Sequence, residues 1–243
     1  MHPTLAVLTW SSLAALAAVL GVLPAALDVR LRLAWLGWSN ALAAGLMLGA
    51  AYALMAAGLG DHVVAGGAGA LGGVLFVHAT HALTGTADLD LNRLDATDPA
   101  YGYQVILVDT LHAAHEGVAI GAAMAVSLPF GILVAMAFAV HNIPEAAILT
   151  SVLRARGMSL VKTALLAVAT NVNQVLLAVA TFAVTAAAPA ALPWAVGFAV
   201  GALVHLVMVE LMPESYREAG TVSIALVTVA AMGSVVLLVG GAW

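Results

Sequence analysis

Two copies of a histidine–carboxylate pair stand in the middle of the chain, inside long apolar stretches. His112 and Glu116 form one pair, and His141 and Glu145 form the other. Residues four positions apart in a helix share one face, one turn apart, so each pair brings an imidazole and a carboxylate together. Two such helices side by side would supply two nitrogen and two oxygen ligands, a set that suits zinc, iron, manganese, cobalt or nickel. The spacing therefore predicts a divalent metal site shared by two helices.

The composition places these pairs in a membrane. Hydrophobic residues make up 64% of the chain and charged residues 8%, which is too few polar groups to cover a water-facing surface. The mean hydropathy of +1.10 agrees with an integral membrane protein. An ionisable side chain at the centre of a membrane helix costs about 2.5–3.5 kcal/mol. Four of them in two neighbouring spans therefore indicate a cavity or an ion pathway.

The apolar stretches predict eight membrane-spanning helices, since each span needs about 20 residues. The expected spans are 4–27, 34–58, 63–84, 102–126, 130–153, 161–187, 192–212 and 221–241. They leave no stretch over for a soluble domain. We therefore expect residues 1–243 to form a single all-α transmembrane domain.

The basic residues predict the orientation. All seven fall in or beside the odd-numbered loops between the expected spans: Arg30, Arg32, Arg93, Arg154, Arg156, Lys162 and Arg217. The positive-inside rule then puts these loops in the cytoplasm and both termini outside. The chain has no basic patch suited to nucleic acid, and it has no cysteine for disulfides or thiolate ligands.

Further polar side chains surround the two pairs. In the fourth span they share an arc of about 120° on one helix face: Asp109, His112, His115 and Glu116. Gly117 and Gly121 lie on the far face, where small residues let another helix approach closely. Asn142 sits beside the fifth-span pair. Gln174 in the sixth span fits an interhelical hydrogen bond as well as a metal ligand, and both interpretations stay open.

Other histidines and carboxylates are expected to have simpler roles. His78 and His81 share one face near the cytoplasmic end of the third span, and packing is favoured over ligation for both. The lone His205 in the seventh span is also expected to pack. Glu210, Glu214 and Glu218 run toward the cytoplasmic edge of that span, where we expect them to reach water.

The two motifs resemble those of a known family. In the fourth span, HAAHEGVAIG resembles the signature His-Asn-x-x-Glu/Asp-Gly-Leu-Ala-Ile-Gly of ZIP (Zrt/Irt-like protein) metal transporters. In the fifth, HNIPEAA resembles their His-Asn-x-Pro-Glu-Gly. The second-span ALAAGLMLGAAYALM and the seventh-span GFAVGALVHLVMVELMPES are similar to two further family segments. The resemblance therefore covers most of the chain.

The resemblance implies a function and an architecture. The function is import toward the cytoplasm of a divalent ion, Zn²⁺ or one of Cd²⁺, Fe²⁺, Mn²⁺ and Co²⁺, as transported substrate and with no cofactor. The architecture is eight transmembrane helices in a 3+2+3 arrangement, in which spans 1–3 and 6–8 are related by a pseudo-twofold axis. The resemblance also implies a homodimer, and we expect it in a bacterial inner (plasma) membrane.

The same resemblance assigns ligands by position. The residues that match family ligands are His112, Glu116, His141, Asn142 and Glu145. The chain departs from the family pattern at three places: Ala113 replaces an Asn, His115 stands near a usual Pro, and Gln174 replaces a frequent sixth-span Glu. His115 and Gln174 remain candidate ligands. Because Ala113 and Gln174 supply no carboxylate, we expect one tightly bound ion.

Two other classes of protein compete with a transporter. An intramembrane zinc-dependent hydrolase would use the same residues to fix one zinc ion and activate a water. The paired symmetry of the two motifs argues against that enzyme. A structural subunit would leave two buried histidine–carboxylate pairs as helix locks, which are costly and seldom stabilising. We therefore expect a transporter and not an enzyme.

Overall fold

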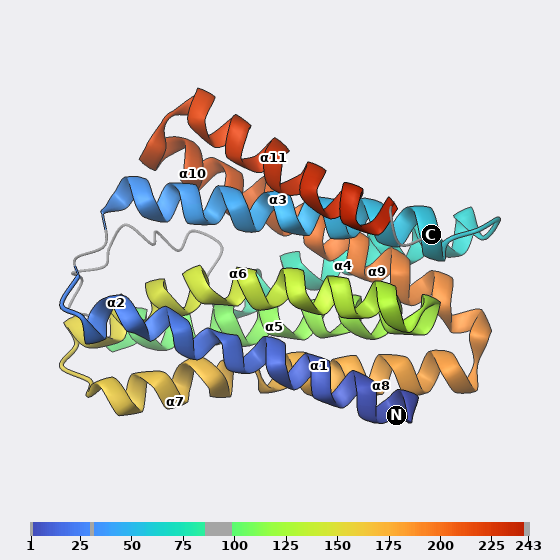
Figure 1. Ribbon diagram of the computed structural model, residues 1–243, viewed down its shortest axis with the longest axis horizontal. Coiled ribbons are helices and arrows are strands. Elements are labelled where there is room, and N and C mark those ends of the chain that lie inside the picture. The colour runs from blue at the N-terminus through green and yellow to red at the C-terminus, as the bar shows by residue number, and fades with distance from the viewer. Residues whose placement is uncertain (1, 30–31, 86–98, 241–243) are drawn as a thin grey trace.

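The computed structural model describes residues 2–29, 32–85 and 99–240, and the elements in these ranges are all helical (Figure 1). They are α1 (Pro3–Ala17), η1 (Ala18–Val22), α2 (Leu23–Ala26), α3 (Leu33–Gly58), α4 (Val63–Thr84), α5 (Pro99–Val126), α6 (Leu128–Ala155), α7 (Leu160–Thr170), α8 (Val172–Ala187), η2 (Pro189–Ala191), α9 (Leu192–Leu206), η3 (Val207–Leu211), α10 (Met212–Ala219) and α11 (Thr221–Gly240).

Seven helical segments of the described chain are long and apolar enough to cross a membrane, judged by length and composition. The eighth long helix, α5, is not among them, and it carries Asp109, His112, His115 and Glu116. The all-α membrane architecture predicted from the sequence is thereby confirmed. The seventh segment continues to Ala219, several residues past the expected end of its span.

The helices form two groups on either side of α5 and α6, with α1, α7 and α8 on one side and α3, α4, α9 and α11 on the other (Figure 1). The most extensive helix contacts pair α4 with α9, α3 with α11, and α5 with α8, while α6 packs along α1 and η1. Exchanging spans 1–3 with 6–8, and span 4 with 5, converts each of these pairings into another. This agrees with the pseudo-twofold arrangement that the family resemblance implies.

Small residues let α4 and α9 approach closely. Gly69 and Gly73 on α4 face Gly197 and Gly201 on α9, each pair with the spacing of four that membrane helices use for close contact. A Cβ atom at Gly73 would overlap the backbone carbonyl oxygen of Phe198. The contact is therefore between backbones, with no room for a side chain.

The same device brings α8 against α5. A Cβ at Gly117 would overlap the backbone carbonyl of Gln174, and one at Gly121 would overlap that of Ala178. The glycine face predicted for the fourth span is thus the face that α8 covers. This contact places the side chain of Gln174 beside Glu116.

A tight turn sets the depth of the two motifs. Ser127 is extended, and its hydroxyl caps α6 by accepting a hydrogen bond from the backbone N–H of Phe130 at 3.3 Å. His112 lies 15 residues before Ser127 and His141 lies 14 residues after it. Because α5 and α6 run antiparallel from this turn and rise equally per residue, the two histidines meet at the same level.

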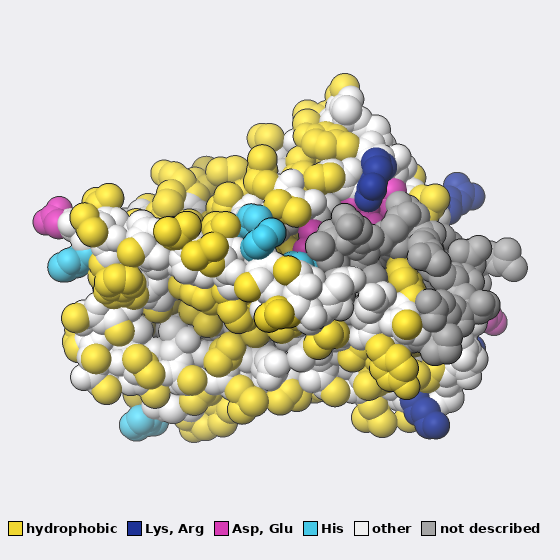
Figure 2. Space-filling view, turned by 180° about the vertical axis from the view of Figure 1, so that it is seen from behind, with side chains coloured by type: hydrophobic (Ala, Val, Ile, Leu, Met, Phe, Trp, Pro, Cys, Tyr) yellow, Lys and Arg dark blue, Asp and Glu magenta, His cyan; other side chains and the backbone are white. Residues whose placement is uncertain are grey.

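The surface divides between an apolar middle and a charged end. Figure 2 shows hydrophobic side chains spread over the face and the visible Lys and Arg side chains gathered at one end. The loops after α2, α6 and α10 lie at one end of the bundle, whereas α1 begins and α11 ends at the other (Figure 1). Arg30 and Arg93 lie outside the described residues.

The α4–α9 contact gives a test of this packing. Replacing Gly73→Ala should lower the thermal midpoint of the purified protein in detergent, because the added methyl group must push α9 away at a cost of about 1–3 kcal/mol. Its neighbour Gly72 has open space around a would-be Cβ. Gly72→Ala is therefore the matched control and should keep the midpoint or raise it. Equal midpoints for the two variants would contradict the close contact.

Candidate metal site

Glu116, His141 and Glu145 form the first buried cluster, at the level where α5 and α6 face each other. One ligand atom from each lies within 4.8 Å of the others. His141 Nε2 is 2.9 Å from Glu116 Oε1 and 3.9 Å from Glu145 Oε2. Glu116 is completely buried and His141 is nearly so. A carboxylate from each helix and an imidazole thus converge on one point.

His112 adjoins this cluster from α5. Its Nδ1 is 3.4 Å from Glu145 Oε1. The shortest contacts of the two motifs are therefore crossed, since the histidine of each approaches the glutamate of the other. The sequence predicts a half-site on each helix, and the structure brings all four residues together between the helices.

The charges at this point are unbalanced without a cation. Glu116 and Glu145 contribute two negative charges when ionised, and neutral histidines add none. No Lys or Arg lies between residues 94 and 153, the stretch that carries both motifs. Burying carboxylates without compensation is costly, so a divalent ion would neutralise the pair.

The close pair His141 and Glu116 is also not a satisfied hydrogen bond. Although Nε2 and Oε1 are 2.9 Å apart, neither atom has a hydrogen-bond partner among the described residues. The N–H and oxygen directions are therefore not aligned, and the lone pairs of both atoms remain available to an ion.

Gln174 and Asn142 support Glu116 from behind. Gln174 Nε2 donates to Glu116 Oε2 at 2.8 Å, and Gln174 Oε1 accepts from Asn142 Nδ2 at 3.2 Å. Asn142 Nδ2 also donates to the carbonyl oxygen of Ala14 at 3.0 Å. This chain of amides leaves Glu116 Oε1 facing His141. In this arrangement Gln174 orients a ligand through its amide nitrogen, while Asn142 Oδ1 has no partner within the described chain.

The helix carrying Gln174 is broken just before that residue. At Asn171 the α7 helix ends, and α8 begins at Val172. The Asn171 side chain donates to the carbonyl of Ala167 at 3.0 Å, which satisfies an acceptor at the break. The break turns the start of α8 toward the glycine face of α5.

His115 lies outside the first cluster. It is 1% exposed, and its ring stands edge-on to that of His112 with 5.7 Å between ring centroids. Its Nε2 has no hydrogen-bond partner among the residues that the structure describes. The sequence predicts a candidate ligand here, and the structure places it beside His112 and away from the Glu116–His141 contact.

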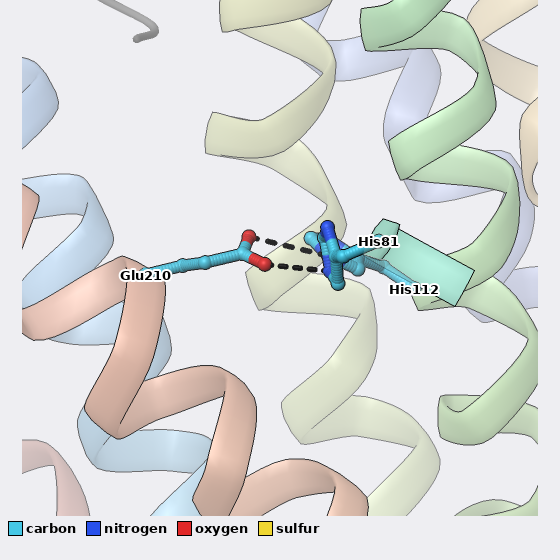
Figure 3. A group of neighbouring side chains, drawn as sticks. All are labelled: His81, His112 and Glu210. Atoms are coloured by element: carbon cyan, nitrogen blue, oxygen red, sulfur yellow. Dashed lines mark ion pairs between the residues drawn. The ribbon is translucent and has the colours of Figure 1, made fainter. Parts of the chain in front are cut away.

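A second cluster consists of His81, His112 and Glu210 (Figure 3). Glu210 Oε1 is 2.7 Å from His81 Nε2, and Glu210 Oε2 is 3.4 Å from His112 Nε2. The packing role expected for His81 and the solvated position expected for Glu210 are therefore wrong. The signal for this cluster was the presence of both polar residues in apolar spans, but nothing in their local spacing links them.

Glu214 also departs from expectation. It is 5% exposed and does not reach water; its Oε2 accepts a hydrogen bond from Asn40 Nδ2 at 3.2 Å. The reason is that α10 continues the seventh helix and packs along α3, which covers this side chain.

Fold and site together define a helical membrane protein with buried histidine–carboxylate clusters of the kind that holds a divalent metal ion. The model of the family described as "ZIP Zinc transporter" matches residues 78–241, which contain both clusters. The chain belongs to this family. Membership of a transporter family argues against the intramembrane hydrolase.

A curated relative agrees with this family. The chain is 35% identical over 211 residues to the Arabidopsis thaliana protein named "Putative zinc transporter At3g08650". The match covers 82% of this chain and 33% of the plant protein. The chain thus spans about a third of the length of that relative.

Proposed function

We propose that the protein moves divalent transition-metal ions, with Zn²⁺ the leading candidate, across a membrane toward the cytoplasm. The observation that carries this proposal is the cluster of Glu116, His141 and Glu145, joined by His112, buried between two helices of a ZIP family chain. Two carboxylates and two neutral imidazoles offer a dehydrated divalent ion a charge-neutral position within the bundle.

Transport through such a site requires alternating access. Glu116 and His141 are buried from both ends of the bundle in this conformation, so an ion held there needs a rearrangement to enter and to leave. Rocking or sliding of one helix group against the other is the motion that membrane transporters use for this purpose. The two groups on either side of α5 and α6 are suited to such a motion (Figure 1).

The ligand set bears on the choice of ion. Imidazole and carboxylate ligands without thiolate suit Zn²⁺, and also Cd²⁺, Fe²⁺, Mn²⁺ and Co²⁺. We therefore propose that these ions compete for one site. Ligand protonation opposes binding, because both histidines must be neutral and both glutamates ionised to hold an ion. Uptake is accordingly expected to weaken as the pH falls.

The proposed direction rests on charge. Arg32, Arg154, Lys162 and Arg217 lie in or beside loops at one end of the bundle, and we assign that end to the cytoplasm. Both termini then lie outside. A bacterial inner membrane, a homodimer and a single transport domain remain predictions that rest on the family resemblance and on the lengths of the spans.

The first functional prediction concerns the buried glutamates. Glu116→Ala or Glu145→Ala should abolish saturable zinc uptake by proteoliposomes containing the purified protein, because each change removes a charged ligand. Asp61→Ala, which removes an exposed carboxylate between α3 and α4, is the control and should leave uptake intact. Near-normal uptake by either ligand variant, in protein that elutes as a folded species, would sink the assignment.

The orientation has a separate test. Because the chain has no cysteine, single cysteines can be introduced at Asp61 and at Lys162, which are exposed at opposite ends. In intact cells, Asp61→Cys should react with an impermeant thiol reagent, whereas Lys162→Cys should react only after the cells are opened. The reverse pattern would overturn the orientation and with it the direction of import.

The number of ions is also testable. We expect one tightly bound ion between α5, α6 and α8, because Ala113 offers no ligand and the Gln174 amide nitrogen already donates to Glu116. The double variant Ala113→Asn with Gln174→Glu should bind a second ion beside the first, since it adds an oxygen ligand and a negative charge. Metal analysis of the two purified proteins measures the difference. Two ions between these helices in the unaltered protein would show the expectation to be wrong.

A further inference from the structure

We propose that His81, His112 and Glu210 form a second metal site, which receives the ion from the first cluster on its way out. This inference rests on the proposed function for the identity of the ion and the direction of travel. Its geometry stands on its own, since three ligand atoms from three elements lie within 4.8 Å of one another. One imidazole from α4, one from α5 and one carboxylate from η3 make a set that suits Zn²⁺.

The side chains converge as ligands do. Glu210 points across from η3 and presents one oxygen to each histidine (Figure 3). The His81 and His112 rings are 5.8 Å apart between centroids and are tilted by 53°, so they do not stack. His81 and His112 are buried, and the side chain of Glu210 is 28% exposed. One side of the cluster thus stays open toward solvent or a neighbouring pathway.

The backbone at Glu210 carries independent evidence. Residues Val207–Leu211 form a π-helical turn within an otherwise α-helical segment, and such turns are frequent at functional sites. Pro213 follows two residues after the turn and lacks the N–H that an α-helix would direct to the carbonyl of Val209. The irregular turn is therefore compatible with the proline, and it rotates Glu210 toward α4 and α5.

His112 belongs to both clusters. Its Nδ1 faces Glu145 of the first cluster and its Nε2 faces Glu210 of the second, at 3.4 Å in each case. A neutral imidazole has one nitrogen with a free lone pair, while the other nitrogen carries the proton. His112 can therefore ligate an ion in only one of the two clusters at a time.

This sharing makes the two sites successive positions for one ion. When Nδ1 binds the ion with Glu145, Nε2–H can donate to Glu210. When the ion moves on and binds Nε2, the proton resides on Nδ1 and can be donated to Glu145. The ion and the proton exchange sides of the same ring, and the number of protons is unchanged.

The position of the second cluster gives the order. His81 lies in the last turn of α4, close to the end of the bundle at which the loops with the basic residues lie. Under the proposed orientation that end is cytoplasmic. The second site is then the inner of the two, on the exit side of the first.

Zinc binding by the purified protein tests this site without relying on transport. The first cluster is disabled by the conservative changes Glu116→Gln, His141→Gln and Glu145→Gln, which leave His112 in place. Equilibrium dialysis should then find one Zn²⁺ per protomer, bound more weakly than in the unaltered protein. Adding Glu210→Gln should remove that binding. Adding His78→Ala, which changes an exposed histidine one turn before His81, should not.

Two results would overturn the second site and leave only an ion pair: no zinc bound by the disabled variant, or binding that is indifferent to Glu210→Gln. Should the triple variant not fold, cadmium-soaked crystals of the unaltered protein decide. An anomalous peak between His81 and Glu210 supports the site, and a peak at the first cluster alone overturns it. Failure of zinc uptake with binding at His81 intact would instead contradict the proposed function.

Discussion

The constraint on which the rest of the structure depends is the burial of negative charge. Glu116 is fully buried, Glu145 is largely buried, and both approach histidines that are neutral when they act as ligands. An apolar bundle tolerates two such carboxylates only if a cation compensates them. The basic residues are kept to one end of the molecule, so an ion that enters the bundle is the available source of positive charge. The empty site is costly by itself, and this cost favours occupancy.

Close helix packing is what lets the polar groups converge. Glycines on α5 admit the backbone of α8, which brings Gln174 against Glu116, and the tight turn at Ser127 sets the two histidine motifs at one level. On the other side, the glycine contact between α4 and α9 positions the elements that carry His81 and Glu210. His112 stands where the two sides meet. Its two ring nitrogens face two carboxylates, and this position is the basis for regarding the clusters as steps of one path.

Much of this arrangement could be predicted from local patterns. A spacing of four identified the two motifs, apolar length identified the helices, and the helical wheel identified the glycine face that α8 covers. The second cluster was not predictable in this way. His81 and Glu210 are 129 residues apart, and their contact depends on how α4 packs on α9 and on a π-helical turn that shifts the helical register. Periodicity also predicted that Glu214 reaches water, because it carries no information on the packing of α10 against α3.

The most direct test of the central claim is the X-ray absorption spectrum at the zinc edge, recorded on purified protein loaded with one Zn²⁺ per protomer. The account predicts nitrogen and oxygen ligands at about 2.0–2.2 Å, with the outer scattering of imidazole rings. In a His141→Ala variant loaded in the same way, the imidazole contribution should fall. A spectrum without imidazole scattering, or one that is identical in the variant, would contradict a zinc site built from the two paired motifs.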